Sequence, residues 1–582
     1  MGRALSYASI LFLAASAGAE ILPRTLTNAA EFASKQYDYL VVGGGTAGLA
    51  VAARLSEDPK ITVGVIEGGQ YMPNDPLIDT PRSAISLQGN PKYDWMFETT
   101  PQPNLNNRVI PIPRGKGLGG SSMINLMVFN RASKKEYDAW GEVGNTGWSW
   151  KDLLPYMKKA ERFTSTDPFR ANSSGPSGIY PSQGQNGPIA ASFNDWYSDM
   201  TTPYNQAMDS GNPFGQYNSA TAVNRTTGKR SYAGTTYFAY NAERPNFVVL
   251  TGAQATKIDF ENPTVTGGKL RATGVSFVSN STDYSAYARK EVILSAGAIQ
   301  SPQILELSGI GNSTILRALG ISPLIDLPGV GEDLQDHPFI SASYELKPGK
   351  TTFDILRNNA TFAAEAQAQY ANTHDGIYAT TISILSFVDL KTFVSSTKLN
   401  AMRKQLDQEI AASKPSRLQE KQYQIQKSWI NQKLGHVEFI FNPGYFGAGP
   451  PKANTSYVAM LMILQHPFSR GSVHINSSDP LAKPTFDPRY FSKSFGPPPN
   501  VVTDADLLTY AKTYTRTIHH PIGTAAMAAK ELGGVVGPDL KVYGTANLRI
   551  VDASIIPLHM GTHLSRTVYG IAEKAAAMIK SG

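Results

Sequence analysis

The stretch from residue 37 to residue 69, YDYLVVGGGTAGLAVAARLSEDPKITVGVIEGG, constrains the fold more than any other part of the chain. The apolar run from Tyr39 to Val42 predicts a buried strand, and the segment after the glycine turn predicts a helix to about Ser56. A second apolar run at residues 62–66 predicts another buried strand. Two buried strands joined through a helix are typical of a parallel sheet in an α/β fold.

The glycines of this turn have the spacing of a dinucleotide-binding site. In the pattern G-x-G-x-x-G, Gly43 permits the tight turn and Gly45 lets a pyrophosphate approach the backbone. Gly48 lets the helix pack closely on the strand, and the N-terminus of the helix offers amide donors and a positive dipole end. Glu67, at the end of the second strand, would accept hydrogen bonds from the adenosine ribose. We therefore predict a Rossmann-like unit that binds either NAD or FAD.

The composition indicates a loop-rich protein of more than one packed unit. The chain has 582 residues, 41% of them hydrophobic, with 51 glycines and 38 prolines. Its net charge of +7 includes no dense basic run beside aromatic residues, so we expect no nucleic-acid partner. The absence of cysteine excludes disulfides, thiolate metal sites and a thiol nucleophile. No apolar stretch of about eighteen residues lies in the body of the chain, so we expect no membrane span.

The N-terminal segment has the pattern of a secretory signal. Arg3 precedes a largely apolar run at residues 4–15, and residues 17–19 (AGA) form a small-x-small cleavage pattern. We therefore predict a signal peptide at residues 1–19, cleaved near Ala19, and a secreted protein. Seven N-x-S/T patterns are candidate glycosylation sites: Asn172, Asn224, Asn280, Asn312, Asn359, Asn454 and Asn476.

A second glycine-rich segment and a middle region follow. The run RGKGLGGSSMIN, from Arg114 to Asn125, leads into an apolar segment, which favours a ligand cradle over a flexible linker. Residues 133–162 predict a helix, and the charged stretch at 397–432 predicts a long helix. Together with strand-like runs such as HVEFIF and SYVAMLMIL, residues 340–510 indicate a second domain that supplies the wall of a pocket.

Four blocks occur in one order along the chain: the dinucleotide turn, the Arg114 to Asn125 segment, GAIQSPQILELSGIG (297–311), and a C-terminal set with HHPIGT, VDAS and His563. Together they resemble the glucose–methanol–choline (GMC) family of FAD-dependent oxidoreductases. The resemblance implies an α/β fold, with a Rossmann-like FAD-binding domain and a second α+β substrate domain built on a mainly antiparallel sheet. The implied FAD-binding domain comprises residues 34–145, 236–335 and 511–582, and the substrate-binding domain comprises 146–235 and 336–510.

The resemblance decides between the two dinucleotides, because the C-terminal histidines and the final helix have no role in a nicotinamide site. We expect FAD to be bound non-covalently, since no histidine lies between residues 70 and 130. The final helix, at about 564–579, would point its N-terminus at the flavin ring. The cofactor-binding residues implied by the resemblance are Gly43, Gly45, Thr46, Ala47, Gly48, Glu67, Arg114, Gly119, Ser121, Ser122, Asn125, Leu126, Met127, Val128, Ala255, Asp552, Ala553, His563 and Leu564.

The resemblance implies that His520 and His563 are the catalytic pair. Alcohol oxidation needs a base for the hydroxyl proton, and imidazole suits this task because its ordinary pKa lies near neutrality. His559 and His563 also have the spacing of a metal pair on a helix, but Pro557 and Gly561 interrupt the segment, so we expect no metal. The remaining histidines are interpreted as surface or core residues (His337, His374, His436, His466 and His474) or as a packing residue behind the site (His519). Glu438, beside the run Phe439–Phe441, has two interpretations, a residue that lines the pocket and a satisfied strand residue, and the second is favoured.

The predicted function is a secreted FAD-dependent oxidoreductase that oxidises an alcohol to a carbonyl by hydride transfer to flavin N5. Electrons would pass to O2 or to a quinone-like acceptor. An alternative is an FAD-containing biosynthetic enzyme of secondary metabolism that closes a lactone or catalyses a non-redox cyclisation on the same fold. A third reading, a non-enzymatic secreted glycoprotein, is disfavoured by the intact pair of His520 and His563.

Overall fold

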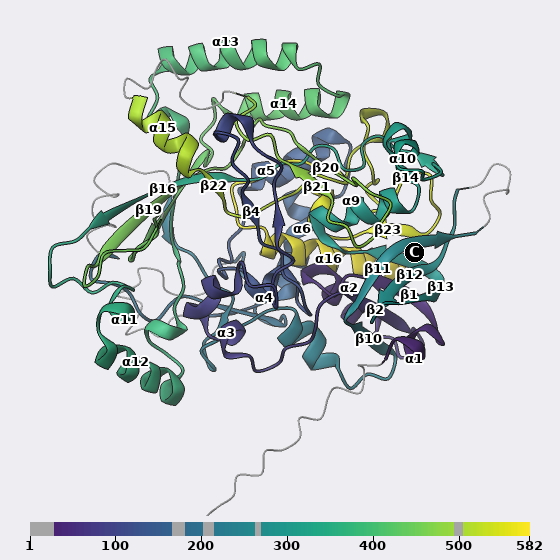
Figure 1. Ribbon diagram of the computed structural model, residues 1–582, viewed down its shortest axis with the longest axis horizontal. Helices are drawn as coiled ribbons and strands as arrows, with labels where there is room; N and C mark the ends of the chain where they lie inside the picture. The colour runs from purple at the N-terminus through teal and green to yellow at the C-terminus, as the bar shows by residue number, and fades with distance from the viewer. Residues whose placement is uncertain (1–27, 166–180, 202–214, 262–268, 448, 494–504) are drawn as a thin grey trace, which may run out of the picture.

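The structure is a computed structural model that describes residues 28–165, 181–201, 215–261, 269–447, 449–493 and 505–582. Two large sheets organise these ranges, each with its own set of helices (Figure 1). The expected signal peptide and the glycosylation candidate Asn172 lie outside the described residues. Among the helices in these ranges, none is both long enough and apolar enough to cross a membrane.

The first sheet has seven strands and is mixed. Its parallel part runs in the order β10 (Phe247–Thr251), β2 (Val63–Glu67), β1 (Gln36–Val42) and β13 (Thr282–Leu294), and β23 (Leu548–Ile550) also pairs with β13 in parallel. An antiparallel extension follows from β13 through β12 (Ala272–Ser279) to β11 (Ala253–Phe260). The α/β fold class predicted from the first strands is confirmed.

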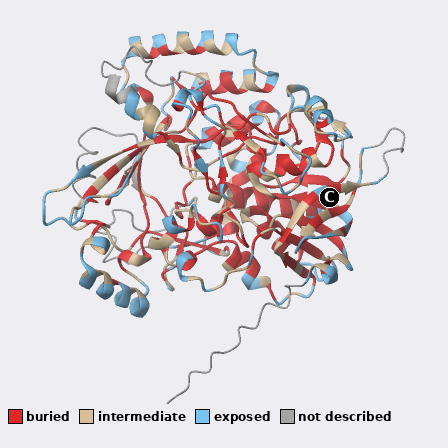
Figure 2. Cartoon of the chain, in the orientation of Figure 1, coloured by how far each residue is buried: buried red, intermediate tan, exposed pale blue. Residues whose placement is uncertain are grey.

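Helices cover the parallel part of this sheet, and its strands are therefore buried. Six of the seven residues of β1 are buried, and α2 (Thr46–Leu55) starts directly after the glycine turn. A Cβ on Gly48 would lie 1.9 Å from the carbonyl oxygen of Gly43, so only glycine allows this helix to follow the strand so closely. The final helix, α16 (Ser565–Ser581), packs against α2 and against α6 (Trp150–Ala160). Figure 2 shows the buried residues concentrated in this half of the molecule.

The second sheet is antiparallel and has six strands. Their order is β22 (Arg516–Thr517), β16 (Pro338–Glu345), β19 (Tyr457–Leu464), β18 (Val437–Asn442), β17 (Ile384–Val388) and β7 (Gln216–Asn218). The strands expected at HVEFIF and SYVAMLMIL are β18 and β19. β22 belongs to the C-terminal segment 511–582, so that segment contributes strands to both sheets.

Two segments that were predicted as single helices are interrupted in the structure, so both predictions were wrong on this point. Residues 133–162 hold a short helix α5 (Lys134–Asp138), a 3-10 turn and then α6, because Gly144 and Gly147 adopt positive φ values of 101° and 84° between them. The charged stretch at 397–432 forms two helices, α13 (Ser396–Ala412) and α14 (Arg417–Trp429), rather than one. Lys414, at φ 48° before a proline, breaks the helical path between them.

Candidate active site

A cavity of about 650 Å³ extends from the glycine turn of the first sheet to the second sheet. Eighteen of the predicted site residues line it: Gly43, Gly45, Thr46, Ala47, Glu67, Arg114, Ser121, Ser122, Asn125, Leu126, Met127, Val128, Ala255, His520, Asp552, Ala553, His563 and Leu564. Two predicted residues, Gly48 and Gly119, are not among its lining residues. The fold thus gathers segments more than 500 residues apart around one space.

At the end of the cavity near β2, backbone amides hold the side chain of Glu67 in place. The carboxylate of Glu67 accepts hydrogen bonds from the backbone N–H of Gly44 at 2.9 Å and of Gly69 at 2.7 Å. Burial raises the pKa of Glu67 to about 7, although these amides oppose the effect. Glu67 is therefore a fixed acceptor at the position where the sequence predicts the ribose.

Gly119 joins the two glycine-rich segments. Its backbone N–H donates to the carbonyl oxygen of Gly44 at 2.8 Å, and its φ of 105° lies in the region that favours glycine. The side chain of Ser122 donates to the carbonyl oxygen of Gly119 at 2.6 Å. Gly119 thus supports the cavity from behind instead of lining it.

The rest of the Arg114 to Asn125 segment turns toward the cavity. Asn125 follows the short helix α4 (Ser121–Ile124), and its Oδ1 accepts hydrogen bonds from the backbone N–H of Met127 and from Arg230, both at 3.0 Å. Met127 has a φ of 61°, which is unusual for a residue with a side chain. Arg114 donates to the carbonyl oxygen of His519, and so links this segment to the C-terminal histidines.

Asp552 has a task that the sequence did not predict. Its Oδ2 accepts hydrogen bonds from the backbone N–H of Gly297 at 2.9 Å and from the hydroxyl of Ser301 at 2.6 Å. Its Oδ1 accepts from the backbone N–H of Ser554 at 2.8 Å. Asp552 therefore holds the start of helix α9 (Gly297–Leu307) against the cavity wall.

His520 and His563 lie next to each other in the cavity wall. Their ring centroids are 4.9 Å apart and the rings are nearly perpendicular, at 86°. The backbone N–H of His520 donates to Asp336 at 2.8 Å, and that of His563 donates to Asn130 at 2.9 Å. Burial, followed by the neighbouring His563, lowers the pKa of His520 well below 6.5. His520 is therefore a neutral imidazole near pH 7, able to accept a proton.

Two residues behind this pair contact it directly, which the sequence did not indicate. His337, placed among the surface or core histidines, is fully buried, and its Nδ1 lies 3.0 Å from the Nδ1 of His520. Glu438, interpreted as a satisfied strand residue, is also fully buried, and its Oε1 lies 3.0 Å from the Nε2 of His563. The two-residue period of a strand gives Glu438 the same face as Ile440, which lines the cavity. That period was the available signal for Glu438.

Four further histidines have hydrogen-bonding partners other than the rings of His520 and His563. His559 contacts the carbonyl oxygen of His520 through Nε2 at 3.0 Å and accepts from the backbone N–H of Met560, so it does not turn toward His563. His466 contacts Glu136 at 2.7 Å. His474 lies between two glutamates, and His436 bonds the carbonyl oxygen of Trp429. His519 lines the cavity, with its pKa lowered to about 3 by burial and by Arg114.

The part of the cavity at the second sheet is apolar. Its lining includes Leu126, Phe339, Ile382, Ile440, Phe446 and Leu461. The guanidinium of Arg516 lies 5.3 Å from the ring centroid of Phe339 and 5.0 Å from that of Phe446. A ligand in this part would contact hydrocarbon walls and the guanidinium of Arg516.

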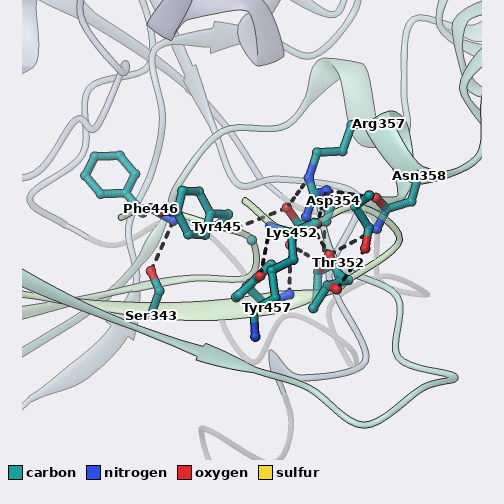
Figure 3. Close-up of polar contacts among 12 residues, drawn as sticks. Ser343, Thr352, Asp354, Arg357, Asn358, Tyr445, Phe446, Lys452 and Tyr457 are labelled. Atoms are coloured by element: carbon teal, nitrogen blue, oxygen red, sulfur yellow. Dashed lines mark hydrogen bonds and ion pairs between the residues drawn. The ribbon is translucent and has the colours of Figure 1, made fainter. Parts of the chain in front are cut away.

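The loop that carries Phe446 is held by a buried carboxylate (Figure 3). Asp354 accepts hydrogen bonds from the backbone N–H of Tyr457 at 2.8 Å and of Tyr445 at 3.3 Å, and its Oδ1 lies 3.0 Å from the Nε of Arg357. The N–H of Phe446 donates to the hydroxyl of Ser343 at 3.3 Å. These contacts fix one aromatic wall of the cavity without using any group that faces it.

Two family models account for most of the chain. One GMC oxidoreductase model matches residues 37–339, and a second matches residues 493–572. The chain belongs to the GMC oxidoreductase family. A dehydrogenase of Armillaria gallica is 36% identical over 600 residues, covering 94% of both chains. An FAD-dependent oxidoreductase from Chaetomium thermophilum is 29% identical with a TM-score of 0.83, and a fungal aryl-alcohol oxidase is 30% identical with a TM-score of 0.81. Each alignment covers 94% of this chain and 99% of the other.

This GMC protein is an oxidoreductase and its cofactor is FAD. The cavity fits that cofactor at its glycines. A Cβ on Gly45 would meet only the Cα of Gly120, at 3.8 Å, and a Cβ on Gly297 would meet no atom within 4 Å, and both glycines line the cavity. Helices α2 and α9 also begin at this wall, and the N-termini of helices suit the negative charge of a pyrophosphate.

Proposed function

We propose that the enzyme oxidises the CH–OH group of an alcohol to a carbonyl. The observation that carries the proposal is the pairing of His520 with His563 in the wall of the same cavity that the glycine turn lines. Two imidazoles beside a flavin site supply what alcohol oxidation requires of a protein, namely a proton acceptor and a second polar group that orients the hydroxyl.

In this proposal His520 is the base. It is held by Asp336 from its backbone and by His337 from its ring, while its Nε2 has no hydrogen-bonding partner within the described part of the chain. The hydroxyl proton would move to this nitrogen, and His563, held by Glu438, would orient the oxygen. When bound, FAD would supply the acceptor for the hydride that leaves the carbinol carbon.

The cofactor would lie non-covalently along the glycine segments. Gly43, Gly45 and Glu67 would hold the ADP half, with Ala255 near the adenine, and Gly48 would keep α2 close to the strand. The Arg114 to Val128 segment, Asp552, Ala553 and the start of α16 would surround the rest. The assignments rest on the cavity that these residues share and on the membership of the family.

We further propose an apolar alcohol as the substrate class and O2 or a quinone-like compound as the electron acceptor. The hydrocarbon lining near Leu126, Ile440 and Phe446 supports an aryl or aliphatic alcohol over a sugar, which would need several polar partners. Secretion is also proposed, on the signal-like residues 1–19 and on the described sequon asparagines, all of which reach solvent at least partly. N-terminal sequencing of protein from a culture medium would test cleavage near Ala19.

An anaerobic alcohol screen tests the proposed reaction. The holoenzyme is mixed with aryl, aliphatic, furan and sugar alcohols without oxygen, and the yellow flavin absorbance is followed. We expect bleaching with aryl or aliphatic alcohols, and recovery of the colour when O2 or a quinone is admitted. If the flavin stays oxidised with every alcohol, the proposal fails, and a non-redox or lactone-forming reaction takes its place.

A further inference from the structure

We propose that His337 is a positioning residue that fixes the tautomer of His520, so that the bare nitrogen of His520 faces the cavity. The inference rests on the proposed function, because it assigns a purpose to a contact of the proposed base. It follows from a chain of three groups: the carbonyl oxygen of Gln465, the ring of His337 and the ring of His520.

The hydrogen bond between His337 and Gln465 decides which nitrogen of His337 carries the hydrogen. The Nε2 of His337 lies 3.0 Å from the main-chain carbonyl oxygen of Gln465. A carbonyl oxygen can only accept a hydrogen bond, so the Nε2 of His337 must carry the hydrogen. A neutral His337 then has a bare Nδ1, which can only accept. Burial, followed by the neighbouring histidines His559 and His520, lowers the pKa of His337 well below 6.5, which supports the neutral ring.

The hydrogen bond between His337 and His520 then decides which nitrogen of His520 carries the hydrogen. The Nδ1 of His520 lies 3.0 Å from the Nδ1 of His337, so the hydrogen between them must belong to His520. A neutral His520 with a hydrogen on Nδ1 has a lone pair on Nε2. That nitrogen is the one without a protein partner within the described residues, and His520 lines the cavity. The geometry therefore presents a proton acceptor to the alcohol before the alcohol arrives.

The ring of His337 is held on three sides. It is fully buried, and it stacks on His559 with ring centroids 3.5 Å apart. Its own backbone N–H donates to Asp336 at 3.0 Å, the same carboxylate that holds the backbone of His520. Flipping the ring would place a carbon beside the carbonyl of Gln465 and beside His520, so both hydrogen bonds would be lost together.

The hydrogen bonds from His520 through His337 to Gln465 fix the tautomer of His520, but they carry no proton away from it. When the alcohol O–H bond breaks, its proton forms an N–H bond at the Nε2 of His520, and the ring becomes an imidazolium with a hydrogen on each nitrogen. Its Nδ1–H continues to donate to His337. The carbonyl of Gln465 cannot take a proton from His337, so no proton leaves through this hydrogen-bond chain.

Gln465 also reaches the other catalytic histidine. Its side-chain Nε2 donates to Glu438 at 2.8 Å, and Glu438 contacts the Nε2 of His563. Gln465 directly follows β19, and so this one residue orients His520 through its main chain and His563 through its side chain. Because only the side chain can be substituted, the link to His520 is best tested at His337 itself.

The decisive experiment observes the tautomer directly. Holoenzyme labelled with 15N in the histidine rings is studied by NMR at pH 7, and the His520 signals are assigned by their loss in His520→Ala. We expect His520 to carry its hydrogen on Nδ1, with a bare Nε2. In His337→Leu, which keeps much of the volume but removes the acceptor, the hydrogen should move to Nε2. A hydrogen on Nε2 of His520 in the native enzyme would overturn the proposal, as would an unchanged tautomer in His337→Leu.

Kinetics provide the second readout. His337→Leu should lower kcat by about 100-fold with little change in KM, as expected when a base is held in the wrong tautomer. His436→Leu is the matched control, because buried His436 also bonds a main-chain carbonyl but has no contact with His520. That variant should stay within about twofold of the native kcat. Equal losses in both variants would assign a packing role to His337 and contradict the proposal.

The proposed function and this inference can fail separately. If the NMR signals show the expected tautomer while no alcohol bleaches the flavin, the positioning role stands and the reaction is wrong. If alcohols bleach the flavin while the tautomer is the opposite one, the reaction stands and the role of His337 falls.

Discussion

His474 should contribute stability that is present near neutral pH and lost in mild alkali. Its Nδ1 lies 2.7 Å from Glu306 of α9, and its Nε2 lies 3.1 Å from Glu332. Burial alone would lower the pKa of His474, but the two carboxylates outweigh it and raise the pKa to about 9. The side chain is only 15% exposed, so solvent screens these contacts weakly.

The magnitude and the sign follow from linkage. The folded chain has a pKa of about 9 at His474, against 6.5 for an ordinary histidine in the unfolded chain. At about 1.4 kcal/mol per pKa unit, the difference corresponds to an upper limit of about 3–4 kcal/mol. Because the folded pKa is the higher one, this stability is complete below pH 6.5. It decreases as the pH rises and is gone above about pH 9.

The test compares free energies of unfolding from urea curves at pH 6 and pH 10. His474→Gln should destabilise the holoenzyme by about 2–3 kcal/mol at pH 6 and by much less at pH 10. The exposed His374 offers a control, and His374→Asn should change neither value by more than about 0.5 kcal/mol. A loss in His474→Gln that is equal at the two pH values would show that packing, and not the charge on His474, supplies this stability.

Four further substitutions separate the tasks of individual residues. Gly45→Ala should fold and yet bind FAD at least about tenfold more weakly in a fluorescence titration, because its Cβ enters the cavity. Gly48→Ala should yield little folded protein, because its Cβ would overlap the carbonyl of Gly43. Glu438→Leu should lower kcat about tenfold in steady-state assays while the flavin spectrum is retained, since His563 loses its acceptor; an unchanged kcat would remove Glu438 from the account. Asp354→Ala should cost about 2–3 kcal/mol in urea unfolding and raise KM more than it changes kcat, because two backbone N–H groups behind Phe446 lose their acceptor.

The parts of the fold that were predictable are those whose signal is local. The first strand, the glycine turn and α2 follow one another within twenty residues, and each has its own periodicity or spacing. The final helix, expected at about 564–579, is α16, because its apolar face repeats with the helical period. The breaks between α5 and α6 and between α13 and α14 were missed because single residues with positive φ decided them.

The partners of His520 and His563 were not predictable from spacing. His337 and His520 are 183 residues apart, and Glu438 and His563 are 125 residues apart. Their contacts depend on the pairing of β16, β18 and β19, and a one-residue change of register would turn Glu438 to the other face. Motifs indicated which histidines to consider, but only the arrangement of the second sheet determines which groups hold them.

Rapid mixing of the native enzyme and of His520→Ala with the best alcohol, without oxygen, measures the rate of flavin reduction with and without the proposed base. If His520 accepts the hydroxyl proton, its removal slows this step while the flavin site still forms. We predict that His520→Ala retains FAD and its visible spectrum, and that its flavin bleaches about 10²–10⁴-fold more slowly, the range typical of a lost general base. A variant that binds FAD normally and bleaches at the native rate would show that His520 is not the base.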